Sequence, residues 1–171
     1  FRNDSLAAVL GDWILFVDAD ERVTPLLRSE IEETITQHAA KSAYAIGRQS
    51  IILGRHMMHG GWGTDLKSPH NSYAIRLFKR SDLKEYQGEL HEQPVYTGEL
   101  GYLKNYLVHI THRNLSLMVE KTIVFTDYES KLMYASNHPE VVWWRFISVM
   151  SREFWLRFVT LKAYKDGTEG I

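Results

Sequence analysis

The 171-residue sequence predicts an α/β fold on the strength of three observations. A short apolar run at Trp13–Val17 has the length and the β-forming side chains of a strand. Strong helix-start signals follow it at Thr24 and Pro25, and two further strand-like runs come after that helix. Strands that alternate with helices are the pattern of a sheet covered by helices.

Local signals justify the first two elements. Phe1–Leu10 is expected to be the end of a helix that Gly11 terminates, with Leu6, Ala7 and Leu10 on its inner face. Trp13–Val17 follows after a short connection, and its apolar character predicts a buried central strand.

The next helix has the clearest boundaries in the chain. Thr24 is the expected N-cap and Pro25 the first helical residue, and the helix should end near His38. Its apolar residues repeat every four positions, which predicts a buried stripe with glutamates facing water on the other side. The stripe is Leu27, Ile31 and Ile35, and the glutamates are Glu30, Glu32 and Glu33.

The remaining elements are predicted from alternation, breakers and apolar periodicity. The glycine-rich stretch Gly54–Asn71 is expected to be a long functional loop, because long irregular segments are uncommon in compact domains. The expected strands are Ser42–Ile52, Tyr73–Lys79, Val95–Thr97 and Tyr106–Ile110, and the expected helices run from Leu115 to about Tyr134 and from Pro139 to about Tyr164.

Composition limits the possible partners. The formal net charge is -1, so the chain has no general electrostatic attraction to nucleic acid, and no nucleic-acid partner is expected. There are no cysteines, which excludes disulfides and thiolate metal sites. No run of apolar residues is long enough to predict a membrane-spanning helix.

An acidic group follows the first strand and is the main functional candidate. Asp18, Asp20 and Glu21 come directly after Trp13–Val17, where their carboxylates repel one another and a cation would relieve the repulsion. Carboxylate oxygens one residue apart are the hard ligands that Mg²⁺ or Mn²⁺ prefers. In open α/β sheets, ligands bind beyond the carboxyl ends of the strands. The alternative is a solvated acidic turn that leads into the helix.

Two further polar groups are candidates for chemistry. Glu92, in the polar segment Gly88–Gln93, could be a general base, or an exposed glutamate beside His91. His109 follows an apolar run and could complete a metal site begun by Asp20, since imidazole binds Mn²⁺ readily. Its spacing from His112 also fits a zinc pair on a helix, but Ile110-Thr111 favours extended chain. A satisfied core histidine is the alternative for both, and the preferred one for His112.

The last predicted helix is amphipathic. Its apolar stripe runs along one side, with Arg145 and Arg152 on the other. A basic amphipathic helix with Trp and Phe fits peripheral contact with a membrane surface, and packing on the domain core is the alternative. The stripe consists of Trp143, Ile147, Met150, Phe154, Phe158 and Leu161.

Taken together, these segments resemble family 2 glycosyltransferases of the GT-A fold. Within that family they are similar to bacterial β-1,4-glucosyltransferases that extend the core of lipopolysaccharide or lipooligosaccharide. The order and spacing of the segments cover nearly the whole chain and make the resemblance specific. The segments are RNDSLA, GDWILFVDADERV, GRHMMHGGW, RLFKR, GELHE, LVHITHRNLS and KDGTEG.

The resemblance implies a function and a set of roles. It implies an inverting, Mn²⁺- or Mg²⁺-dependent transfer of a hexosyl group from a nucleotide-sugar, expected to be a UDP-sugar, to a saccharide or lipid-linked acceptor. Asp18 would lie by the ribose, Asp20 would bind the metal, His109 would lie near it, and Glu92 would be the base. His91, Trp62 and Arg76 fall at substrate-binding, acceptor-side or fold-supporting positions. The implied location is the cytoplasmic face of the bacterial plasma membrane.

The resemblance also implies a domain organisation. Residues 1–112 would be the metal and acceptor half of a Rossmann-like GT-A domain, and residues 113–171 a C-terminal region of amphipathic helices. The family's first nucleotide-binding strands precede the D-x-D and are not in this sequence, so we expect a fragment that could be inactive alone.

Two other functions stay open. A phosphohydrolase with an aspartyl nucleophile also has D-x-D after a strand, but Arg22 stands where Thr or Val is usual. A non-catalytic module that binds saccharide or membrane through Trp62 and the last helix is the second alternative.

Overall fold

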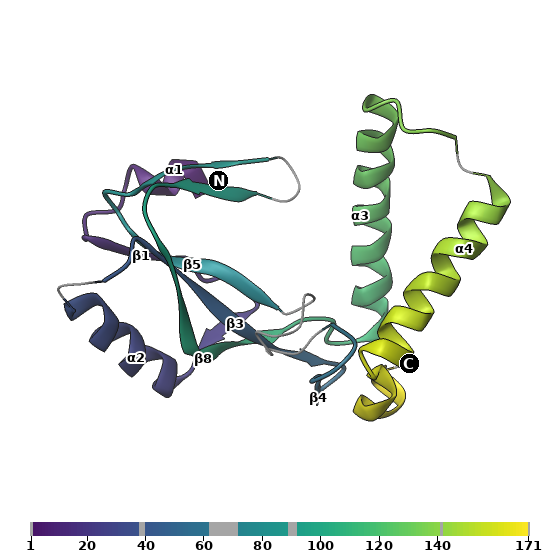
Figure 1. The fold of residues 1–171 in the computed structure, drawn as a ribbon, viewed down its shortest axis with the longest axis horizontal. Helices are drawn as coiled ribbons and strands as arrows, with labels where there is room; N and C mark the ends of the chain where they lie inside the picture. Colours follow the sequence, from purple (N-terminus) through teal and green to yellow (C-terminus); the bar gives the residue numbers. More distant parts are fainter. Residues whose placement is uncertain (1, 38–39, 62–71, 89–91, 141, 171) are drawn as a thin grey trace. The chain divides into compact units, whose positions relative to one another are not determined.

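The structure is a computed structural model that describes residues 2–37, 40–61, 72–88, 92–140 and 142–170 (Figure 1). It combines helices with a six-stranded sheet, so the predicted α/β class is confirmed at that level. The chain divides into two compact units, and each is described by itself. The first comprises Phe1–Gln49 and Thr64–His109, and the second Ser50–Gly63 and Ile110–Ile171.

The sheet has the strand order β1-β5-β3-β8-β2, with β4 paired to β3. The pairs β1–β5, β3–β5, β3–β4 and β2–β8 are antiparallel. β3 and β8 run in parallel, because Ala43 N donates to Glu99 O at their start and Thr111 N donates to Ile51 O at their end. The strands are β1 (Trp13–Leu15), β2 (Glu21–Val23), β3 (Ala43–Ile52), β4 (Arg55–His56), β5 (Tyr73–Lys79) and β8 (Leu100–Ile110).

The expected strands are present, but their positions differ from expectation. β1 stands at one end of the strand order, so the prediction of a central strand is wrong for the described sheet. A separate antiparallel hairpin of β6 (Leu83–Gln87) and β7 (Gln93–Tyr96) was only half predicted, since β6 was not expected. β8 is longer than the short strand expected at Tyr106–Ile110.

The helix α2 (Pro25–Thr36) covers one face of the sheet. Its start confirms the predicted N-cap at Thr24 and the predicted first helical residue, Pro25. The Thr24 hydroxyl accepts a hydrogen bond from Leu27 N at 3.2 Å, which caps the first turn. Leu27 is fully buried, and Ile31 and Ile35 pack on the same core cluster. The sheet contributes Tyr44, Ile46, Leu77, Leu103 and Leu107 to that cluster.

Glu30 on α2 corrects one prediction. It was expected to face water, but its carboxylate accepts the backbone N–H groups of Lys104 at 2.7 Å and Asn105 at 2.8 Å. The carboxylate therefore anchors α2 to β8.

A second core cluster carries α1 (Arg2–Leu6) and the β6–β7 hairpin, which lie side by side in Figure 1. Asn3 ties α1 to the hairpin by donating to Tyr86 O at 2.9 Å and accepting from Tyr86 N at 2.7 Å. Leu6 and Val9 pack on this cluster, whereas Leu10 is 91% exposed and Ala7 is exposed. The predicted inner face is thus wrong beyond Leu6, because the helix ends there and the chain turns away.

The second unit contains the C-terminal helices. α3 is Leu115–Ala135, α4 is Trp143–Phe154, η1 is a π-helical turn at Trp155–Thr160, and η2 is a 3-10 segment at Ala163–Gly170 that kinks at Gly167. The prediction that the last helix opens at Pro139 is wrong, since α4 begins at Trp143. Among the described helices, none is both long and apolar enough to cross a bilayer.

A buried carboxylate holds the second unit together at its base. The Asp166 side chain, 5% exposed, accepts the backbone N–H groups of Met58 at 2.9 Å and His59 at 2.7 Å. Its second oxygen lies 2.6 Å from His59 Nδ1. The C-terminal KDGTEG segment therefore fixes the chain that follows β4.

Candidate functional site

The D-x-D segment forms a tight turn between β1 and β2. Phe16 N donates to Arg76 O at 2.9 Å, which keeps the chain beside β5 up to the first acid. Two bonds then close the turn: Glu21 N donates to Asp18 O at 2.9 Å, and Asp18 N donates to Glu21 Oε2 at 3.0 Å. Ala19 and Asp20 therefore form the tip of a turn whose ends bind each other reciprocally.

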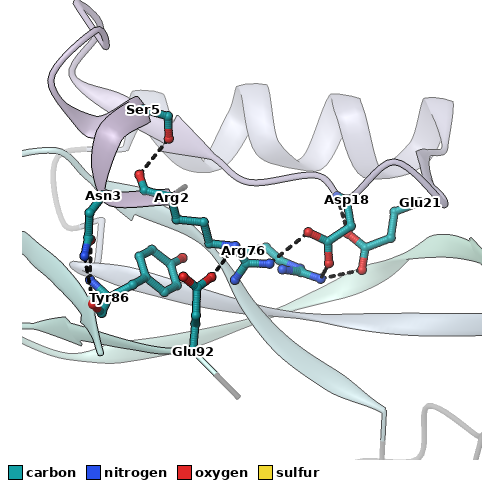
Figure 2. A network of polar contacts seen from close by, with 8 residues as sticks. All are labelled: Arg2, Asn3, Ser5, Asp18, Glu21, Arg76, Tyr86 and Glu92. Atoms are coloured by element: carbon teal, nitrogen blue, oxygen red, sulfur yellow. Dashed lines mark hydrogen bonds and ion pairs between the residues drawn. The ribbon is translucent and has the colours of Figure 1, made fainter. Parts of the chain in front are cut away.

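Two arginines neutralise the acids at the base of this turn (Figure 2). Arg76, on β5, donates to Asp18 and, at 2.7 Å, to Glu21 Oε1. Arg2, on α1, donates to Asp18 Oδ1 at 2.8 Å. The cation expected to relieve the crowded carboxylates is thus supplied in part by the chain itself.

The pKa values reflect this pairing. Burial acts to raise the pKa of Asp18, but the guanidinium groups of Arg76 and Arg2 outweigh it and hold the pKa below its ordinary value of 3.8. Burial acts to lower the pKa of Arg76, but Glu21 and Asp18 outweigh it and raise that pKa. Asp18 and Arg76 therefore both remain charged at neutral pH.

A cavity of about 550 Å³ opens beside Asp18, and Glu92 also lines it. Glu92 Oε2 lies 3.5 Å from Arg2 Nε, so Arg2 connects the first acid of the turn to the predicted base. Tyr86 forms part of the wall, and burial raises the pKa of its hydroxyl to about 12, so it remains protonated. The remaining lining comprises Arg2, Arg48, Tyr73, Ala74, Ile75, Arg76, Gln93 and Pro94.

Arg48, on β3, adds a third guanidinium group to this cavity. Its Nε donates to Ser72 O at 3.4 Å. Burial lowers the pKa of Arg48, and the positive charge of Arg76 lowers it further. The negative charges of Glu21, Asp18 and Asp20 raise this pKa but offset only part of the decrease. Because an arginine pKa starts so high, Arg48 remains charged, and the cavity can receive an anionic group.

Asp20 lies at the other side of the turn, near His109. Glu21 pairs with His109 across β2 and β8, and this register brings His109 Nε2 to 3.4 Å from Asp20 Oδ2. A carboxylate oxygen and an imidazole nitrogen suit Mn²⁺. No cluster of three or more His, Asp, Glu or Cys side chains that could hold a metal ion occurs in the part of the chain that the structure describes.

The alternative of a helical zinc pair at His109 and His112 is wrong. His109 lies in the strand β8, and His112 follows it with a positive φ of 46°. Neither residue is on a helix, where a spacing of three would bring both imidazoles to one side.

The structure brings some predicted site residues together and leaves others outside its described part. Asp18, Glu92 and Arg76 share the cavity, whereas Asp20 pairs with His109. Arg76 binds the chain's own carboxylates, as a fold-supporting residue would. Trp62 and His91 lie outside the described residues.

Sequence reasoning missed Arg2 and Arg48 as parts of this site. Arg2 lies in a short helix and carries no local signal, because its partners are 16 and 90 positions away. Arg48 could have been found, since a charged residue within a predicted strand must either face water or meet opposite charges.

The lowered pKa of Asp18 predicts how acid affects stability. The ion pairs with Arg76 and Arg2 should stabilise the folded protein fully above pH 3.8, and this contribution should be lost as the pH falls through the lower pKa of the folded state. We expect the contribution to be about 1 kcal/mol, because the carboxylate is 41% exposed and water screens it. Urea unfolding of the protein and of Asp18→Asn from pH 7 to pH 3 measures it. A stability difference that does not shrink in acid would contradict the prediction.

Comparison with family models and with solved structures returns no match for this chain.

Proposed function

We propose that the protein is an inverting, metal-dependent glycosyltransferase of family 2 with a GT-A fold. It would transfer a hexosyl group from a nucleotide-sugar to a hydroxyl of a saccharide or lipid-linked acceptor in cell-envelope glycan synthesis. The observation that carries the proposal is the placement of the D-x-D turn. Asp18, at its start, lines a cavity together with Glu92, and Asp20, at its tip, lies beside His109.

Each group has a role in this reaction. Glu92 accepts the proton of the acceptor hydroxyl as that oxygen attacks the anomeric carbon, and the bond to the nucleotide diphosphate breaks. Asp20 and His109 are the candidates to hold Mn²⁺ or Mg²⁺, which would offset the charge of the leaving diphosphate. Arg48 adds positive charge to the cavity, which favours a diphosphate there.

The phosphohydrolase alternative is less well supported by the same geometry. An aspartyl nucleophile needs a carboxylate oxygen that is free to attack phosphorus. Both oxygens of Asp18 accept hydrogen bonds from arginines, Oδ1 from Arg2 and Oδ2 from Arg76. These bonds hold the carboxylate as a fixed acceptor and lower its basicity.

Calorimetry on the full-length protein tests the proposed function. A UDP-sugar should bind in Mn²⁺ and bind at least tenfold more weakly in EDTA, and a suitable acceptor should then release UDP. Hydrolysis of a phosphate monoester without sugar transfer would favour the phosphohydrolase. Saccharide binding that is indifferent to metal would favour the non-catalytic module.

We further propose that α4 docks on the cytoplasmic face of the plasma membrane, where lipid-linked acceptors are presented. No residue of α4 is buried within the described structure. Most of its exposed apolar residues share one side of the helix, opposite Arg145 and Arg152, which suits an anionic bilayer surface, whereas Trp144 and Val149 lie on its flanks. The residues on the shared side include Trp143, Phe146, Ile147, Met150 and Phe154, each more than half exposed.

Vesicle flotation measures this docking. The full-length protein should float with vesicles containing anionic lipid, and Ile147→Glu should reduce the floated fraction severalfold, because it places a charge in the apolar side. Ser148→Glu adds the same charge at the next position, on the polar side, and should reduce flotation much less. Equal losses for both variants would contradict docking through this face.

A further inference from the structure

Glu21 is the most buried acid of the D-x-D segment, with an exposed fraction of 1%. Both of its carboxylate oxygens are engaged: Oε1 accepts from Arg76 at 2.7 Å, and Oε2 accepts the backbone N–H of Asp18 at 3.0 Å. Its own N–H returns a bond to Asp18 O. Because both oxygens of Glu21 already accept hydrogen bonds within the chain, this carboxylate fixes the backbone of the turn and has little capacity left to bind a ligand.

Arg76 completes the arrangement from the neighbouring strand. Its side chain is 5% exposed, and one nitrogen, Nη2, reaches both Asp18 and Glu21. Its carbonyl accepts Phe16 N, so the main chain of Arg76 is fixed to the residues that lead into the turn. The same residue therefore sets both the backbone and the charge at the start of the D-x-D, and Figure 2 shows its contacts with the two carboxylates.

We propose that Glu21 and Arg76 are positioning residues that hold the D-x-D turn in one geometry before metal or substrate binds. They keep Asp18 directed into the cavity and present Asp20 at the tip, beside His109. The expected effect of Glu21 and Arg76 on metal binding rests on the proposed glycosyl transfer. Their expected effect on the geometry of the turn does not.

The energetics of burial are consistent with this role. A buried ion pair usually contributes little net stability, because the cost of removing two charges from water is close to the gain from pairing them. Replacing a buried ion pair by apolar residues of similar volume is often neutral for stability. What an apolar pair cannot supply is an acceptor for Asp18 N–H and a donor for Asp18 Oδ2. Groups around a metal ligand that fix its orientation typically change metal affinity by about 10–100-fold when removed.

The experiment uses the double variant Glu21→Leu/Arg76→Met in the full-length protein. Replacing both charges by apolar side chains avoids a lone buried charge, so the melting temperature should stay within a few degrees of the original. Amide hydrogen exchange of Asp18, followed by NMR, should become at least tenfold faster. Mn²⁺ affinity in the presence of UDP, measured by electron paramagnetic resonance, should fall by about 10–100-fold.

Glu30→Leu is the matched control. Glu30 is also a carboxylate that accepts two backbone N–H groups, but it anchors α2 to β8 away from the turn. It should lower stability without changing Asp18 exchange or Mn²⁺ affinity. A parallel fall in Mn²⁺ affinity for Glu30→Leu would mean that general destabilisation, not positioning, is being measured, and would overturn the inference.

The outcomes separate this inference from the proposed function. If the unaltered protein binds no Mn²⁺ with UDP, the metal-dependent function fails, and Asp18 exchange alone decides the positioning role. If the Asp18 amide already exchanges fast in the unaltered protein, the positioning role of Glu21 and Arg76 is overturned without any variant. The inference can therefore be tested even if the double variant does not fold. Unchanged Asp18 exchange or unchanged Mn²⁺ affinity in a folded double variant overturns it as well.

Discussion

Replacing Glu92 by glutamine is expected to slow sugar transfer by about 10²–10⁴-fold, the range typical of losing a general base. Glutamine keeps the size and shape of the side chain but cannot take the proton from an acceptor hydroxyl. Glu92 lines the same cavity as Asp18, and Arg2 lies 3.5 Å from its carboxylate and helps to hold its position. The loss should therefore fall on the chemical step.

Single-turnover kinetics and calorimetry separate the two possible effects of this substitution. Transfer in a single turnover should fall, while the affinity for the nucleotide-sugar in Mn²⁺ should stay near its original value. Glu99→Gln makes the same chemical change at an exposed position, where the side chain pairs with Lys41 at 3.3 Å, and should transfer normally. Transfer by Glu92→Gln at close to the original rate would place the base elsewhere.

Much of the fold could be predicted because its signals are local. The start of α2 follows from Thr24, which caps the first turn, and from Pro25, whose fixed φ suits the first helical position. The limits of β5 match the strand predicted at Tyr73–Lys79, although Arg76, Leu77 and Phe78 are buried in succession and do not alternate. β6 was missed because its buried residues, Leu83 and Tyr86, lie three positions apart and do not follow the period of two expected of a strand. Both are buried in a cluster with Ile14 and Phe78, of which Ile14 is distant in the sequence. The start of α4 was misplaced because Pro139 is permissive for a helix start but does not require one.

The same difference between local and long-range signals decides which site residues could be predicted. The acids of the D-x-D could be found because three carboxylates after an apolar strand are unusual in any local context. His109, beside Asp20, could also be predicted, whereas Arg76 was placed here only by the resemblance and Arg2 was not found. Arg76 meets Asp18 across 58 positions, and the pairing of β1 with β5 brings them together. The structure therefore changes the interpretation of this segment: two of its acids are neutralised by arginines, and Asp20 is the one placed at the turn tip beside a histidine.

Replacing Asp20 by alanine is expected to weaken metal-dependent binding of the nucleotide-sugar by about a hundredfold or more. Losing a group that merely orients a metal ligand costs about 10–100-fold, so losing a ligand itself should cost at least the upper end of that range. The fold should survive, because Asp20 is partly exposed and the bonds that close the turn belong to Asp18 and Glu21. His109 would remain as a single nitrogen donor.

Calorimetric titration of a UDP-sugar, in Mn²⁺ and in EDTA, gives the measurement. The proposal requires that the two titrations converge for Asp20→Ala, because the metal no longer contributes, while they differ for the original protein. Asp12→Ala removes an exposed carboxylate at the other end of β1, and its two titrations should differ as in the original protein. If Asp20→Ala kept a full difference between Mn²⁺ and EDTA, the metal would have to bind elsewhere, and the acid at the turn tip would serve only to hold His109 in place.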